Sequence, residues 1–74
     1  MATAPKNTTV HDLLMTAPDD QVTRLKLAWK DAAAGNWGDA AHWLRNAARE
    51  GDTAWHDECA VLAVELEAKD KPEH

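Results

Sequence analysis

Two glycines, each followed at once by a residue that suits a helix start, divide the middle of the chain into helix-length segments. Gly35 precedes Asn36, and Gly51 precedes Asp52. Glycine is common just after the last residue of a helix, whereas Asn and Asp side chains cap the next N-terminus. The spacing predicts one helix ending near residue 34, a second between the glycines and a third after Asp52. No segment alternates polar and apolar residues with a period of two, so no strand is predicted.

Apolar residues recur at helical spacing in each of these segments and predict the buried faces. The first helix is expected over about residues 17–34. The predicted inward residues are Val22, Leu25, Trp29, Ala32 and Ala33 in the first helix, Trp37, Ala40, Ala41, Leu44, Ala47 and Ala48 in the second, and Trp55, Cys59, Leu62, Ala63 and Leu66 in the third. Because the connections are short, the predicted fold class is all-α: a small three-helix antiparallel bundle, or a helical hairpin plus one.

Capping patterns before the bundle predict a short N-terminal helical turn. Thr9 is followed three residues later by Asp12, the layout of a capping box, ahead of Val10–Met15. The stretch TAPD, residues 16–19, repeats this layout with Pro18 in the first turn, where proline is tolerated.

The length of 74 residues favours one domain with a small core. We expect a disordered tail over residues 1–8, a single helical domain over 9–68 and a frayed tail over 69–74. Cys59 is the one cysteine and cannot form an internal disulfide. Stability must therefore come from packing of the four tryptophans or from self-association.

The charge balance and the lack of long apolar runs exclude several classes of protein. The net charge is −5, and the eight basic residues are scattered, so direct nucleic-acid binding is disfavoured. No apolar run approaches the roughly 18 residues of a membrane span, and the N-terminus lacks the apolar stretch of a signal peptide. We therefore expect a cytoplasmic protein without membrane association.

Three residues are the main candidates for metal binding or catalysis: His42, His56 and Cys59. A structural zinc site needs four ligands. The fourth would have to come from Asp52, Glu58 or His11. The same His–Cys pair could serve as base and nucleophile, but a ligand pocket of about 300–1,000 Å³ is large for so small a core. We therefore expect neither an enzyme nor a cofactor.

A Gly–x–aromatic turn, followed by small and large apolar residues at fixed spacing, runs through the middle of the chain. The residues that carry this pattern are Gly35, Trp37, Ala40, Leu44 and Ala47, after the large–small pair Leu27 and Ala28. Over residues 24–52 the pattern resembles one hairpin of a tetratricopeptide-type repeat. Arg24 and Asp31 depart from the apolar residues preferred there, and Asp52 stands where proline usually closes the repeat. The resemblance implies a helix-hairpin surface that binds protein and has no catalytic role.

Some apolar residues fall outside the predicted inward faces. Val61 and Val64 lie opposite the inward stripe of the third helix, Leu27 lies away from that of the first, and Trp43 lies at the edge of the second. The two valines and Leu27 are either ordinary exposed aliphatics, or the third helix is covered on both sides, by the N-terminal segment or by another chain. Trp43 is either an interface anchor or a ring folded over its own helix pair.

The sequence favours a small non-catalytic protein-binding module with a regulatory or inhibitory role, with a homodimer as one form. The predicted contact residues are Trp43, Leu27, Val61 and Val64, with specificity from Arg45, Asp39 and Glu65. Two alternatives stay open. One is an acidic, phage-type inhibitor that mimics nucleic acid or blocks a host nucleic-acid-binding defence complex. The other is a small metal-binding protein that uses His56 and Cys59.

Overall fold

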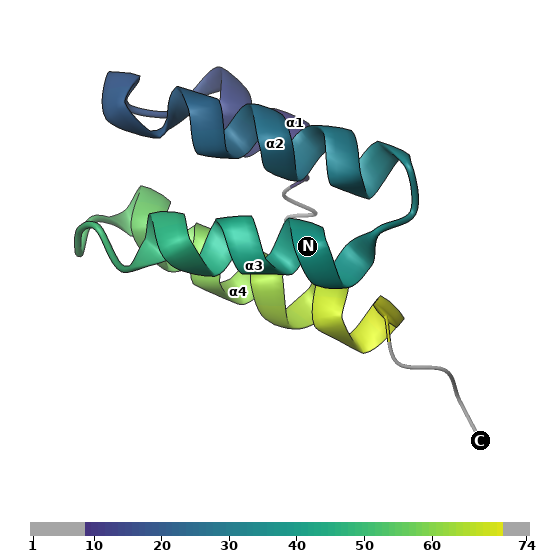
Figure 1. The fold of residues 1–74 in the computed structure, drawn as a ribbon. Coiled ribbons are helices and arrows are strands. Elements are labelled where there is room, and N and C mark those ends of the chain that lie inside the picture. Colours follow the sequence, from purple (N-terminus) through teal and green to yellow (C-terminus); the bar gives the residue numbers. More distant parts are fainter. Residues whose placement is uncertain (1–8, 71–74) are drawn as a thin grey trace, which may run out of the picture.

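The computed structural model describes residues 9–70, which form four α-helices and one turn of 3-10 helix (Figure 1). The elements are α1 (Val10–Met15), the 3-10 turn (Asp19–Gln21), α2 (Val22–Ala33), α3 (Trp37–Ala48) and α4 (Ala54–Asp70). Helix accounts for 81% of these residues and no strand occurs among them, so the predicted all-α class is confirmed. None of these helices has the length and apolar character needed to cross a membrane. The tails are predicted over 1–8 and 69–74. Residues 1–8 and 71–74 lie outside the described residues, whereas residues 69 and 70 belong to α4.

The three longer helices lie side by side in chain order. α3 packs against both α2 and α4, and the chain reverses direction from each helix to the next (Figure 1). The short α1 packs against α2 and also contacts α4. One bond fixes this last contact, because the Trp55 indole Nε1 donates to the Leu13 carbonyl at 3.0 Å.

The core is built mainly from alanine and leucine. α3 supplies four buried residues, as its spacing predicts: Ala40, Ala41, Leu44 and Ala47. The other helices contribute Val10, Leu13, Leu25, Ala28, Cys59, Leu62, Ala63 and Leu66. Small side chains on α3 allow both neighbours to approach closely, which suits a helix with partners on two sides.

Gly35 ends α2 as its position predicts. Its φ is +83°, a left-handed conformation that favours glycine. The Gly35 N–H donates to the Ala32 carbonyl, and the Asn36 N–H donates to the Asp31 carbonyl at 2.7 Å. This pair of bonds is the Schellman arrangement. Asn36 is the N-cap residue of α3, but the predicted cap by its side chain is absent.

The start of α2 differs from the prediction. Thr9 and Asp12 do form the expected capping box of α1. The second box predicted over residues 16–19 does not form, because the Thr16 hydroxyl donates backward to the Asp12 carbonyl at 3.0 Å and so closes α1. The extended Pro18 leads into the 3-10 turn, and α2 begins only at Val22.

Trp29 is the one predicted core tryptophan that the structure leaves exposed. It is 46% exposed, whereas Leu25 and Ala28 are fully buried. The buried face of α2 is thus rotated from the predicted stripe toward Ala28 and α3. Trp29 lies at the edge of this face, with its ring 6.1 Å from that of His11 on α1.

The start of α4 buries a histidine that the apolar pattern missed. α4 begins at Ala54, and the Thr53 carbonyl accepts from the Asp57 N–H, so the helix starts one residue later than a cap at Asp52 requires. The Thr53 hydroxyl lies 2.7 Å from His56 Nδ1. His56 is 9% exposed and lies three residues before Cys59, on the same face of the helix.

Candidate interaction site

The outward side of α4 is the strongest candidate for a binding surface. Val61 is 60% exposed and Val64 is 58% exposed. They lie three residues apart on the side of α4 opposite the buried Cys59 and Leu62, as the sequence predicts. Three further exposed residues surround them, and together the five are called the α4 outer face: Asp57, Val61, Val64, Glu65 and Ala68.

This face combines aliphatic side chains with carboxylates. Asp57 lies one turn before Val61, and Glu65 lies one turn after it. The helical spacing of Asp57 to the two valines is the signal that could have added it to the predicted contact residues. A partner surface that suits this face carries apolar groups between basic ones.

Trp43 does not belong to this face. Its indole Nε1 donates to Asp31 Oδ2 at 3.0 Å, and its ring packs partly buried against the core. The ring therefore covers the α2–α3 pair, and Asp31, a departure from the repeat pattern, is its partner. Leu27 is half-buried one turn before Asp31 on α2. These two predicted contact residues lie away from the valines.

The charged residues predicted to set specificity are also separated. Arg45 donates through Nε to Glu67 Oε2 at 2.8 Å and through a second nitrogen to Glu67 Oε1. This hydrogen bond and the charge of Glu67 raise the pKa of Arg45 above its ordinary value. Arg45 therefore ties α3 to α4. Asp39 is exposed in the first turn of α3, so only Glu65 of the three lies beside the valines.

The candidate metal residues do not meet. Within residues 9–70, no group of three or more His, Cys, Asp or Glu side chains is arranged to hold an ion. His42 lies exposed on α3 with its Nε2 3.1 Å from the Asn46 amide, while His56 is buried at the start of α4. Burial, with a smaller contribution from Glu58, raises the pKa of the Cys59 thiol to about 12. The thiol stays protonated near neutral pH, which suits neither a metal ligand nor a nucleophile.

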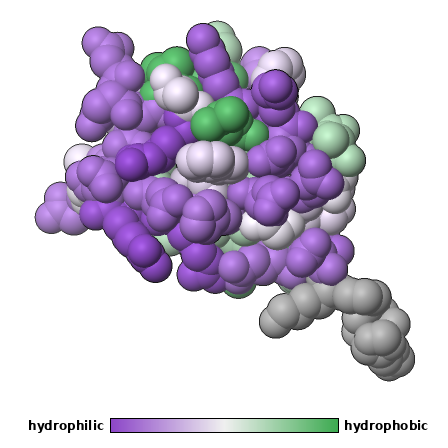
Figure 2. All heavy atoms as spheres, viewed as in Figure 1, coloured by the Kyte–Doolittle hydropathy of each residue, from purple (hydrophilic) through white to green (hydrophobic). Residues whose placement is uncertain are grey.

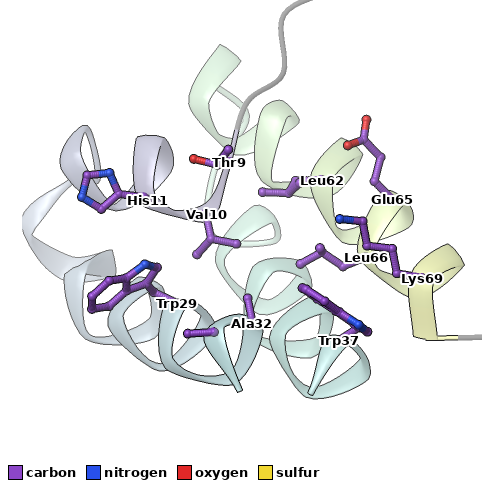
Figure 3. Close-up of a pocket in the computed structure, with 11 residues that line it drawn as sticks. Thr9, Val10, His11, Trp29, Ala32, Trp37, Leu62, Glu65, Leu66 and Lys69 are labelled. Carbon is purple, nitrogen blue, oxygen red and sulfur yellow. The ribbon is translucent and has the colours of Figure 1, made fainter. Parts of the chain in front are cut away.

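A pocket of about 460 Å³ lies between α1, α2 and α4, with one lining residue from α3 (Figure 3). This hollow is larger than the small core suggested. Trp29, near His11, and Trp37, near Lys69, lie at opposite ends of it, and Leu62 and Leu66 line the α4 side (Figure 3). Glu65 and Lys69 carry opposite charges at its rim, and the Lys69 ammonium lies 4.9 Å from the Trp37 ring. His56 and Cys59 are not among its lining residues.

The space-filling view shows a largely hydrophilic face with small, separate apolar patches (Figure 2). No family model, no curated protein and no solved structure matches the chain. The function is therefore inferred from the surfaces described above.

Proposed function

We propose that this chain is a non-catalytic protein-binding module, built as a small antiparallel helical bundle, that contacts its partner through the α4 outer face. The observation that carries the proposal is the exposure of Val61 and Val64 on one side of a helix whose other side fills the core. Single exposed aliphatics are ordinary on protein surfaces. Two on adjacent turns of one face, bordered by carboxylates, form an apolar centre with a charged rim, which is typical of interfaces.

The shape of the site also supports binding of protein. A helix presenting apolar residues at i and i+3 is a common element of helix recognition. The resemblance of residues 24–52 to a tetratricopeptide-type hairpin points to the same class of function. The carboxylates of Asp57 and Glu65 favour a partner with lysine or arginine beside its apolar side chains. The role of such a module is regulatory or inhibitory.

Site-specific photo-cross-linking in cells of the source organism tests this proposal. A benzophenone amino acid at position 64 of the full chain is expected to give a discrete protein adduct on illumination. The matched control carries the same group in place of Arg49, the exposed C-cap residue of α3, and should give none. Equal labelling from both positions, or no adduct from positions 61 and 64, contradicts the proposal.

A further inference from the structure

The two outermost long helices carry opposite charge. α2 has three basic residues, Arg24, Lys26 and Lys30, and one acidic residue. α4 has one basic residue and five acidic ones: Asp57, Glu58, Glu65, Glu67 and Asp70. Since α3 lies between α2 and α4 (Figure 1), these charges lie on two different edges of the molecule.

The outward side of α2 has the same spacing as the α4 outer face. On α4 the column of outward residues stands at 57, 61, 64 and 68. On α2 and its C-cap residue Ala34, positions 23, 27, 30 and 34 repeat these intervals of four, three and four. The α2 outer face is accordingly defined as Thr23, Lys26, Leu27, Lys30 and Ala34, of which Leu27 is half-buried and the others are exposed.

The two faces complement each other in chemistry. Leu27 and Ala34 supply apolar groups for Val61 and Val64, and the ammonium groups of Lys26 and Lys30 match the carboxylates of the α4 outer face. Packing α4 against a second α4 would instead bring Asp57 and Glu65 close to carboxylates of the other copy. Juxtaposed like charges disfavour that arrangement.

We infer that the partner of the α4 outer face is the α2 outer face of a second copy of this chain. This inference rests on the proposed function, because it names the occupant of the same site. The contact is heterologous, because the α4 outer face of one copy binds the α2 outer face of the next. Each copy then has one face still unoccupied, so association continues into a ring or an open chain. A contact made by one helix face on each side falls among small, transient interfaces, and we expect it to be weak.

Sedimentation velocity of the full chain tests the inference. The average mass of the wild type should rise above that of the monomer as the concentration approaches about 1 mM, the range of a weak association. It should fall again when salt is added, because exposed ion pairs are screened. Val64→Glu blocks the α4 outer face, and the double variant Lys26→Glu/Lys30→Glu blocks the α2 outer face. Each variant alone should sediment as a monomer, with unchanged helical circular dichroism.

Mixing the two blocked variants distinguishes this contact from a symmetric dimer. Each retains one intact face, so an equimolar mixture should form a 1:1 dimer and nothing larger. The control Arg49→Glu changes charge by the same amount per site on α3 and should leave self-association within twofold of wild type.

A wild type that stays monomeric throughout, a mixture without dimer, or a dimer formed by Lys26→Glu/Lys30→Glu alone each overturns the inference. If the wild type is monomeric but position 64 cross-links to a different protein in cells, the proposed function stands and the inference about its partner falls. If neither association nor cross-linking occurs, both fall.

Discussion

α3 and α4 are neighbouring helices that bury similar inward faces but present different outward ones. After the first turn of α3, its exposed residues are His42 and Arg45, followed by the exposed C-cap residue Arg49, and all three are polar. α4 exposes Val61 and Val64 together with its carboxylates. α3 has packing partners on two sides within the chain, whereas α4 lies at an edge of the molecule (Figure 1). The chain itself therefore covers the apolar residues of α3, whereas α4 retains an apolar surface that is exposed.

The comparison has a physical basis in the periodicity of the two helices. In α3 the apolar residues form one stripe, and everything outside it is polar. In α4, apolar residues occur around most of the helix, which is typical of a helix covered on both sides. The fold covers only one side of α4, and the valines lie on the uncovered side, where the proposed partner would bind.

The largest expected effect is on the inward face of α3. Leu44 is fully buried between the helices, and Leu44→Ala should lower the free energy of unfolding by about 2–5 kcal/mol through lost burial and a residual cavity. Arg49→Ala, on the outward side of the same helix, should change it by less than about 0.5 kcal/mol. Urea titration followed by circular dichroism measures both. Similar losses for the two variants would contradict the assignment of the α3 faces.

The sequence predicts α3 well because local signals and tertiary packing agree there. Its apolar stripe and its glycine boundary each have a single physical interpretation, and the structure confirms Gly35, Ala40 and Leu44 in their predicted places. The prediction for Trp29 is wrong because periodicity alone cannot locate the axis of a buried face. The stripe that includes Trp29 and the stripe that includes Ala28 differ by one position, and packing against α1 and α3 decides between them.

The candidate site is predictable only in part. Val61, Val64 and Glu65 lie close together on one helix, so helical spacing suffices to group them. Trp43 and Leu27 share only an apolar side chain with them and lie on other helices. The hydrogen bond from Trp43 to Asp31 joins residues from two helices, and no local pattern in the sequence specifies such a contact.

The next effect concerns the entry into α4. A Cβ added at Gly51 would clash with His56 Cε1, and the His56 ring is buried and lies within hydrogen-bond distance of the Thr53 hydroxyl. Gly51→Ala should therefore destabilise the protein by roughly 1–3 kcal/mol, as overpacked sites do. The double variant Gly51→Ala/His56→Ala lacks the ring. Gly51→Ala should therefore lower the free energy of unfolding less in the His56→Ala protein than in wild type. Additive losses in a double-mutant cycle would contradict the predicted clash.

A smaller effect is expected from pH at the inward face of α4. Burial raises the pKa of Cys59 from 9.0 to about 12, so the native state retains this proton after the unfolded chain has lost it. Below pH 9 both states are protonated and Cys59 makes no difference to the pH dependence. As pH rises from 9 toward 12, the unfolded thiolate is favoured and the free energy of unfolding should fall.

The variant Cys59→Ala isolates this contribution from other groups that titrate in the same range. Its free energy of unfolding, measured by urea titration at several values of pH, should fall less steeply above pH 9 than that of wild type. Alkylation of the wild-type thiol at pH 8 should also be much slower in the native protein than in urea. If the free energy of unfolding depends on pH in the same way for the two proteins, Cys59 and the inward side of α4 are accessible to solvent, and the prediction is wrong.

The smallest change in the free energy of unfolding is expected for a substitution on the α4 outer face, because this face is exposed to water in the monomer. Val61→Thr replaces a methyl group by a hydroxyl that water can solvate, so the stability of the monomer should change by less than about 0.5 kcal/mol. The matched substitution Val10→Thr buries its hydroxyl in α1, where Val10 is 6% exposed, and should cost roughly 1–3 kcal/mol. Both are measured by urea titration at low concentration, where self-association is negligible. A loss at Val61 as large as that at Val10 would mean that the chain itself covers the outward side of α4, and the difference between α3 and α4 would disappear.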